Sequence, residues 1–218
     1  MLLRASLIAE DFAASDRALA RKFVALLRRR IVEDKLPTRE LDLQDVELRD
    51  VDLEGLVLRG INADGLKLQK ARLHGATFDD AQLARADLSY CRGRTSLVGA
   101  YLREARLEQA ELRGSSLTRA NLRLARLDAA KLDSCDCAGA SFAKAQVTSV
   151  HFRGADLTDA NFNGADVSEA VFRGATFNDN ALLSLLRADN LAEQSFDDQA
   201  ADDLRRLARG RDPFAPRP

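Results

Sequence analysis

Almost every fifth residue between Leu43 and Phe177 is apolar, and this spacing limits the fold more than any other property of the 218-residue chain. A period of five fits neither the turn of an α-helix, about 3.6 residues, nor the two-residue alternation of a β-strand. Something must therefore reset the direction of the chain in every repeat. The repeat centres are Leu43, Leu48, Leu53, Leu58, Ala63, Leu68, Leu73, Phe78, Leu83, Leu88, Gly93, Leu97, Leu102, Leu107, Leu112, Leu117, Leu122, Leu127, Leu132, Cys137, Phe142, Val147, Phe152, Leu157, Phe162, Val167, Phe172 and Phe177.

A second series of mostly small residues lies two positions before the centres, as Ala71 does before Leu73. If residues alternate inward and outward as in a strand, both series face the same side. Ten of the 12 glycines lie two positions after a centre, where a corner needs a residue that tolerates unusual backbone angles. These are Gly55, Gly60, Gly65, Gly75, Gly99, Gly114, Gly139, Gly154, Gly164 and Gly174. The pattern predicts a coil of short strands and tight turns, with the centres stacked inside.

Individual repeats carry a recognisable motif. Ala-Asp-Leu-Thr-Asp at 155–159, Ala-Asn-Phe-Asn-Gly at 160–164 and Ala-Asp-Leu-Ser-Tyr at 86–90 resemble the pentapeptide-repeat family, whose pattern is Ala-(Asp/Asn)-Leu-x-x. The resemblance covers residues 39–182. It implies an all-β solenoid, a right-handed quadrilateral β-helix with four repeats per coil and about seven coils. At a strand spacing of roughly 4.8 Å, the rod would be about 34 Å long.

The segments on either side are predicted to cap the rod, because a solenoid leaves core side chains and unpaired backbone groups at both ends. We therefore divide the chain into an N-terminal helical cap (1–38), the repeat solenoid (39–182) and a C-terminal helical segment with a flexible tail (183–218). The first segment predicts an amphipathic helix with Ser15 as its N-cap and Pro37 as its stop. Its apolar face comprises Leu19, Phe23, Leu26, Leu27 and Ile31.

The C-terminal segment is rich in leucine. Leu204 and Leu207 indicate one short helix, and Asn180 is a candidate N-cap for another. The latter carries Leu182, Leu183, Leu185 and Leu186. This leucine density exceeds what a simple cap requires and motivates the hypothesis of a homodimer through the C-terminal helix.

The repeats also depart from the family pattern in two places. The usually small position is bulky in the first six repeats, so we expect a wider first coil and a half under the N-terminal helix; these residues are Leu41, Val46, Val51, Leu56, Ile61 and Leu66. Between Cys91 and Ser96 one residue is missing, and we expect a single corner to absorb the loss.

Aromatic centres collect in the later repeats. Counting 20 residues per coil predicts that Phe142 stacks on Phe162 and that Phe152 stacks on Phe172, on opposite walls. Stacked phenylalanines should make the C-terminal coils the most stable part of the rod.

Candidates for catalysis are few. Cys135 and Cys137 both occupy inward positions, where they suit small buried thiols, and three cysteines do not indicate a disulfide framework. His74 and His151 lie next to centres, point outward and are 77 positions apart. No phosphate loop, zinc-spaced ligand set or nucleophile motif is present. We expect no enzyme, no cofactor and no metal site.

Targeting signals are also lacking in the sequence. Met1 to Ile8 is interrupted by Arg4 and Ser6, so it is too short an apolar run for a signal peptide. No stretch approaches the ~20 apolar residues of a membrane-spanning helix. A cytoplasmic location is the default expectation.

A cluster of arginines is the best candidate for a binding surface. Counting 20 residues per coil places Arg103 under Arg123 and Arg106 under Arg126, with Leu124 as an exposed apolar residue beside them. Glu104, Glu108 and Asp128 lie close enough to neutralise these cations. Two interpretations remain: a self-neutralised surface, or a contact with an anion or acidic protein centred on the arginines.

The charge varies along the chain. Residues 41–64 carry seven acids and two bases, residues 85–131 carry five acids and ten bases, and residues 133–182 carry seven acids and three bases. Some pentapeptide-repeat proteins protect DNA gyrase and related topoisomerases from poisons by imitating DNA, which carries one charge per ~1.7 Å. Between residues 41 and 182 this chain holds 21 acids and 18 bases, so only its terminal segments resemble such a mimic.

The sequence thus favours a non-enzymatic scaffold for protein-protein interaction, acting through flat walls and the C-terminal helix. The alternative is a DNA-mimicking protein that binds gyrase or another type II topoisomerase. Direct binding of nucleic acid is disfavoured by the overall charge of −1 and by the interleaving of acids with the central bases.

Overall fold

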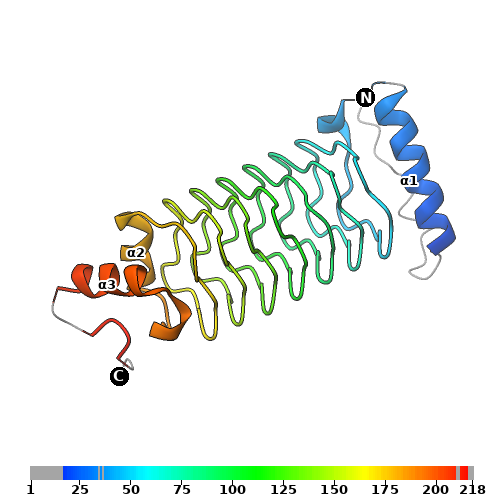
Figure 1. Ribbon diagram of the computed structural model, residues 1–218. Coiled ribbons are helices and arrows are strands. Elements are labelled where there is room, and N and C mark those ends of the chain that lie inside the picture. Colours follow the sequence, from blue (N-terminus) through cyan, green and yellow to red (C-terminus); the bar gives the residue numbers. More distant parts are fainter. Residues whose placement is uncertain (1–16, 34, 36, 210–211, 216–218) are drawn as a thin grey trace.

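The protein is a long four-walled coil with helices at its two ends (Figure 1). The computed structural model describes residues 17–33, 35, 37–209 and 212–215. Its helical elements, in chain order, are α1 (Arg17–Val32), the 3-10 turn η1 (Thr38–Glu40), α2 (Asp179–Leu185), the 3-10 turn η2 (Glu193–Ser195) and α3 (Asp198–Leu207). Helix α1 lies at one end of the coil, and α2 and α3 lie at the other (Figure 1).

Parallel β-bridges connect each coil to the next. Over most of the rod, a bridged residue pairs with the residue 20 positions later, as Asp42 does with Asn62. Four such columns run along the rod, and we name the walls they define A, B, C and D after their first bridged residues, Asp42, Glu47, Asp52 and Val57. Each wall comprises these outward bridged residues and the two turn residues that follow each centre.

A β-turn at each corner explains the five-residue period. The N–H of Leu56, for example, donates to the carbonyl oxygen of Leu53 at 3.0 Å, and the third turn residue, Gly55, has a φ of 66°. All ten glycines predicted at corners have φ between 63° and 70°, which confirms that prediction. Other residues adopt the same angle at this position, including Asp45 at 56° and Leu124 at 62°.

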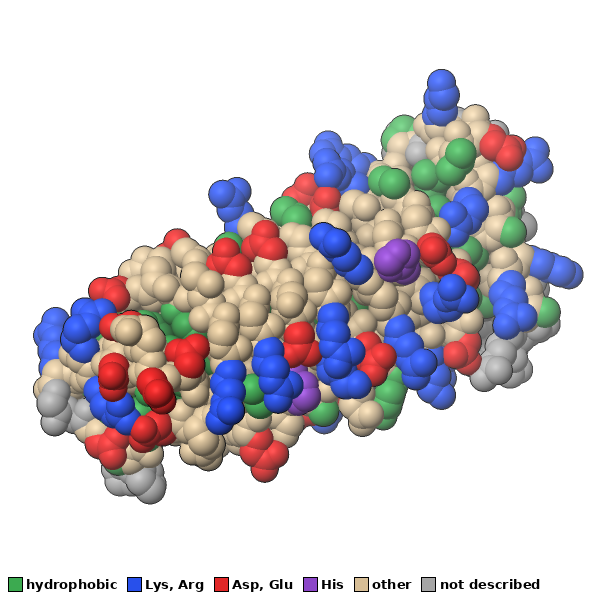
Figure 2. All heavy atoms as spheres, in the orientation of Figure 1, with side chains coloured by type: hydrophobic (Ala, Val, Ile, Leu, Met, Phe, Trp, Pro, Cys, Tyr) green, Lys and Arg blue, Asp and Glu red, His purple; other side chains and the backbone are tan. Residues whose placement is uncertain are grey.

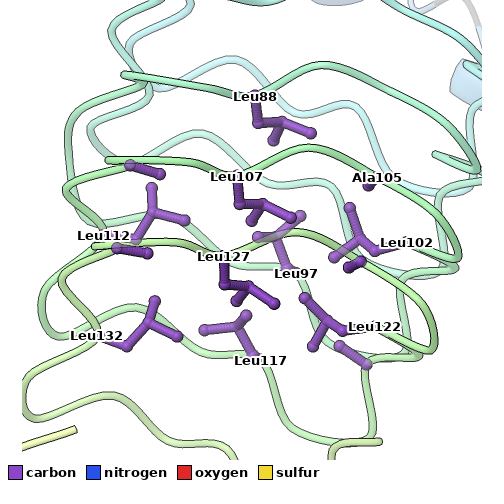
Figure 3. Packing of buried hydrophobic residues seen from close by; sticks show 14 of the residues in the cluster. Leu88, Leu97, Leu102, Ala105, Leu107, Leu112, Leu117, Leu122, Leu127 and Leu132 are labelled. Atoms are coloured by element: carbon purple, nitrogen blue, oxygen red, sulfur yellow. The ribbon is translucent and has the colours of Figure 1, made fainter. Parts of the chain in front are cut away.

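The repeat centres form one continuous core. From Leu43 to Phe172, every centre except Gly93 exposes at most 1% of its surface. Figure 3 shows leucines pointing into the interior in columns, with Leu88, Leu107 and Leu127 one above another. Stacking of like side chains in successive coils buries each centre against its equivalents.

The missing residue is absorbed at one corner, as predicted. On wall D, Thr77 pairs with Ser96, only 19 positions later, whereas the spacing is again 20 from Ser96 onward. Gly93 at this corner has a φ of 121°. The backbone N–H of Thr95 donates to Ser115 Oγ at 3.0 Å, in place of the usual turn bond.

The aromatic ladders are also confirmed. Phe142 stacks on Phe162 with ring centroids 4.9 Å apart, and Phe152 stacks on Phe172 at 5.4 Å. The second ladder continues beyond the repeats, because Phe196 stacks on Phe172 at 5.0 Å. The C-terminal segment thereby extends the core of the coil.

Helix α1 is amphipathic, but its buried face differs from the prediction. Leu27 is 4% exposed and Phe23 and Ile31 pack against the core, whereas Leu26 is 50% exposed. The inclusion of Leu26 was wrong, because it lies about 100° around the helix from Leu27. The side chain of Leu19 is outside the described residues.

Two residues outside the predicted apolar face complete the buried face of α1. Ala20 and Val24 are each 6% exposed and belong to the same core cluster as the first repeats. The helix ends at Val32, five positions before Pro37, so proline does not stop it directly. The predicted N-cap, Ser15, is outside the described residues.

At the other end, helix α2 begins earlier than predicted. Its N-cap is Asn178, whose Oδ1 accepts the N–H of Ala181 at 3.0 Å. Asn180, the predicted cap, lies inside the helix, and its Nδ2 donates to Asp159 Oδ1 at 2.8 Å. Asn178 takes the cap position because its extended backbone directs the side chain back to the first turn.

The leucines of the C-terminal segment divide into buried and exposed residues. Leu182 and Leu185 are 4% and 0% exposed, Leu186 is partly buried against the core, and Leu183 is 43% exposed. Helix α3, expected from Leu204 and Leu207, is present and buries Leu204 completely; Leu207 is partly buried.

Candidate interaction surface

The structure brings the predicted arginine cluster together across two neighbouring coils. Arg106 and Arg126 form a bridged pair on wall B, and Arg103 and Arg123 occupy successive positions at the corner between walls A and B. The two corners are joined directly, because the N–H of Glu104 donates to the carbonyl oxygen of Arg123 at 3.0 Å. Leu124 projects from the same corner.

Acidic side chains neutralise the wall B pair. Glu108 Oε1 lies 3.3 Å from Arg106 Nε and 3.2 Å from Arg126 Nε, so one carboxylate joins both guanidinium groups. Asp87 lies 3.7 Å from Arg106, and Asp128 lies 3.9 Å from Arg126. Self-neutralisation, the first of the two interpretations, holds for these two arginines.

The corner arginines differ from each other. Arg103 pairs with Glu104 at 3.1 Å; a hydrogen bond with Tyr101, and then the charge of Glu104, raise the pKa of Arg103. Arg123 is exposed and forms no ion pair with a described residue. Beside it, Leu124 is 36% exposed. The part of the cluster that is left without a carboxylate is therefore one cation, Arg123, next to one apolar side chain, Leu124.

The distribution of charge around the rod was missed by reading the sequence linearly. Wall C carries seven Lys or Arg against four Asp or Glu, and both histidines also lie on it. The basic residues are Arg72, Arg92, Arg94, Arg113, Lys131, Arg153 and Arg173, and the acidic residues are Asp52, Glu54, Glu111 and Asp133. Figure 2 shows a row of Lys and Arg side chains along one face of the rod, together with the two histidines.

Up to residue 178, wall D carries more acidic than basic residues. Its acidic residues are Asp79, Asp80, Asp136, Asp156 and Asp159, and its basic residues are Arg59 and Arg119. Assigning residues to walls by steps of 20, reduced to 19 across the missing residue, would have found both walls in the sequence.

The cysteines are enclosed in the core. All three are buried, and burial is the main reason why the pKa of Cys91 is raised to about 12. The pKa of Cys137 is raised by its hydrogen bond with Cys135 and by burial. Buried thiols that stay protonated are poor nucleophiles.

The histidines lie apart on the surface. His74 is exposed, and His151 Nδ1 lies 3.2 Å from Arg153 Nη1. Within the described part of the chain, no three His, Cys, Asp or Glu side chains are grouped to hold a metal ion. No helix in that part is both long and apolar enough to cross a bilayer.

A family model for pentapeptide repeats matches residues 42–80, 57–92, 95–133, 120–159 and 135–174, in eight copies. The chain belongs to the pentapeptide-repeat family. Its matched segments cover more than half of the chain and agree with the bridged coils. Membership of this family establishes a right-handed β-helical solenoid. No curated protein sequence matches this pentapeptide-repeat protein.

Solved structures of other pentapeptide-repeat proteins are similar to it. HetL from a Nostoc cyanobacterium, involved in heterocyst differentiation regulation, is 29% identical over 62% of this chain and 61% of its own length, with a TM-score of 0.25. A thylakoid lumen protein from Arabidopsis thaliana is 25% identical over 62% of this chain and 88% of its own, with a TM-score of 0.26. Full-length QnrB1, a plasmid-mediated fluoroquinolone resistance protein, is 18% identical over 78% of this chain and 90% of its own, with a TM-score of 0.29.

Proposed function

We propose that this pentapeptide-repeat protein is a non-enzymatic scaffold that binds a protein partner through its flat walls and its C-terminal helical segment. In this proposal, residues 39–182 form about seven coils, and residues 1–38 and 183–218 cap the two ends. The observation that carries it is the exposed corner formed by Arg123 and Leu124, which no carboxylate of the described residues neutralises.

The chemistry of this corner suits a protein surface. An exposed leucine beside a guanidinium offers apolar area and a charge-assisted hydrogen bond within one contact, and arginine is enriched in protein interfaces. Leu124 is held at a rigid corner with a φ of 62°, so little conformational entropy is lost when a partner orders it. We therefore expect a partner that presents a carboxylate next to an apolar side chain.

A photo-crosslinking amino acid at position 144, the exposed residue one coil after Leu124, tests this surface. Proteins crosslinked to the wild-type sequence should be lost when Arg123→Glu and Leu124→Asp are combined. Lys70→Asp, at an exposed corner of wall B three coils before Arg126, is the matched control and should leave crosslinking unchanged. Identical crosslinks in all three proteins would rule out this corner as the contact.

A homodimer through the C-terminal helix would depend mainly on the side chain of Leu183. Leu182 and Leu185 are buried within the chain, whereas Leu183 is exposed. If the helix mediates a dimer, the Leu183→Asp substitution should make the protein monomeric while its fold is kept. Light scattering at increasing concentration measures this, and a wild-type protein that stays monomeric contradicts the dimer.

The alternative function is binding to gyrase or another type II topoisomerase as a mimic of DNA. The acidic wall D favours it, because its carboxylates lie in line along the rod. The basic wall C opposes it, since duplex DNA is negative on every side. A gyrase supercoiling assay with and without a quinolone separates the two functions, and no effect at micromolar protein counts against the mimic.

A further inference from the structure

Two stacks of like charge in the later coils have no compensating partner among the residues that the structure describes. On wall C, Arg153 and Arg173 occupy the same turn position in consecutive coils. Arg153 contacts His151, and Arg173 donates to the carbonyl oxygen of Gln194 at 3.5 Å. Among the described residues, neither arginine has a carboxylate within ion-pair distance.

Wall D carries the opposite stack, which begins 17 positions before Arg153. Asp136 and Asp156 are bridged to each other and both are exposed. Each carboxylate accepts only a backbone N–H of its own turn, that of Ala138 at 3.1 Å and that of Thr158 at 2.9 Å. No described cation pairs with either of them.

The two cations that directly precede the arginine stack on wall C are paired. Arg113 pairs with Asp133 at 3.1 Å and Lys131 pairs with Glu111 at 2.6 Å, each across one coil. Like charges directly opposite each other on neighbouring strands are destabilising. Two uncompensated stacks of opposite sign on adjoining walls are therefore open to neutralisation by another molecule.

The spacing of the charges identifies that molecule. Successive coils place the charges roughly 4.8 Å apart, whereas residues on one face of an extended peptide are roughly 6.6 Å apart. A second solenoid with the same pitch keeps such charges in register, whereas a single extended peptide does not. We propose that wall C of one copy binds wall D of a second copy, with Arg153 and Arg173 facing Asp136 and Asp156.

This contact joins two different walls, so each copy can bind two neighbours. Adjoining walls of a four-walled rod face directions about a quarter-turn apart, and heterologous contacts close into a ring when the rotation permits. Because Asp136 lies 17 positions before Arg153 in a coil of 20 residues, each contact also shifts the next copy by roughly 4 Å along the axis, and copies with parallel axes form an open helical assembly. The proposal is separate from the partner-binding corner at walls A and B, and from a dimer through α2, because it uses neither surface.

Charge-swap variants test the contact. One variant carries Arg153→Glu and Arg173→Glu, and the other carries Asp136→Lys and Asp156→Lys. Each alone brings like charges together and should be monomeric in sedimentation velocity at low salt. Their equimolar mixture restores opposite charges at both contacts and should associate again. Lys144→Glu on wall A is the matched control and should associate as the wild type does.

Salt provides a second measurement. The Debye length falls from about 30 Å at 0.01 M to about 3 Å at 1 M, so association of the wild type should be strong at the lower ionic strength and lost at the higher one. Thermal melts of each variant establish that it is folded. The proposal is overturned if the wild type is monomeric at low salt, or if folded variants fail to associate when mixed.

Discussion

Single residues at the corners decide how closely successive coils can stack. At most corner glycines an added Cβ would meet nothing closer than 3.5 Å, and the chain accepts Asp45 or Leu124 with φ near 60° at this position as readily as glycine. Gly93 is different. A Cβ at this position would lie 2.6 Å from the backbone nitrogen of His74, and its φ of 121° is outside the range that other residues adopt easily.

We predict that Gly93→Ala destabilises the protein by at least about 2 kcal/mol, because both the backbone angle and the clash with the previous coil oppose the methyl group. Gly55→Ala is the matched control, since its φ is 66° and nothing lies within 4 Å of the added Cβ. It should cost about 1 kcal/mol. Urea unfolding of both variants measures the difference, and equal losses would contradict it.

Asp79 links the coils on either side of the shortened corner. It accepts hydrogen bonds from Arg59 Nη2 at 2.7 Å, from the N–H of Val98 at 3.1 Å and from the hydroxyl of Ser96. Burial opposes its ionisation, but the hydrogen bonds from Ser96, Arg59 and Val98 outweigh that effect and lower the pKa of Asp79.

Because its pKa is lowered, the stabilisation that Asp79 provides is sensitive to acid. The ordinary pKa of the carboxyl is 3.8, so its stabilising contribution is present above that value and is lost as pH falls through the lower folded-state pKa. We predict that Asp79→Asn costs about 1–3 kcal/mol at neutral pH and that the difference from wild type shrinks below pH ~3. Urea unfolding between neutral pH and pH ~2 tests it; a constant difference would exclude the ionised carboxyl as the cause.

At the scale of elements, the C-terminal segment acts as a continuation of the coil. Phe196 is 5% exposed and stacks on Phe172 with an interplanar angle of 12°, as a residue of another coil would. Helix α2 contributes Leu182 and Leu185 to the same core. The five-residue spacing ends before Phe196, so the sequence did not predict that this residue would continue the phenylalanine ladder.

We predict that Phe196→Ala destabilises the protein by about 3–5 kcal/mol, through loss of buried area and of a stacked pair. Phe214→Ala should cost less, because Phe214 is partly buried and its ring lies 6.4 Å from that of Phe196 at 44°. Guanidinium unfolding of both variants compares them. A larger loss for Phe214→Ala would show that the ladder does not end at Phe196.

At the scale of the whole molecule, stability should increase toward the C-terminal coils. There the interior contains two phenylalanine ladders that also contact each other edge to face, with Phe142 and Phe152 5.5 Å apart. The central coils contain leucines instead, as Figure 3 shows. Each aromatic pair adds about 0.5–1.5 kcal/mol beyond its buried area.

Hydrogen exchange is expected to reveal this gradient. Backbone amides of the coils around Phe152 and Phe162 should exchange more slowly than those of the coils around Leu53 and Leu58, because opening them breaks the ladders. Mass spectrometry of peptides from both regions measures the rates. Faster exchange in the later coils would mean that the ladders do not control local opening.

The repeat spacing predicted most of the fold because each five-residue unit contacts its equivalents one coil away. The corner glycines, the inward cysteines and the ladder of Phe142 and Phe162 all followed from counting. The ends were less predictable. Leu26 and Asn180 were assigned from spacing and residue type alone, whereas the direction in which a helix docks and its exact start decide which side chains are buried or cap it.

The candidate site was predictable as a cluster but not as an accessible surface. Counting placed Arg103 near Arg123 and Arg106 near Arg126, and the structure places them so. Which cations remain uncompensated depends on side-chain directions that a repeat count does not contain. Glu108 reaches both wall B arginines, and Arg123 is left beside Leu124.

The five-residue period by itself determined a coil of short strands and tight turns with the apolar centres inside, and the resemblance to the pentapeptide-repeat family implied its four corners. The sequence also determined an alternation of acidic and basic segments along the chain. Only the tertiary structure decided how the coils align across the missing residue, and this alignment makes wall C basic and wall D acidic along the whole rod. The reason is geometric: residues 20 apart become neighbours in space, except for the pairs that span the missing residue at Gly93, which are 19 apart.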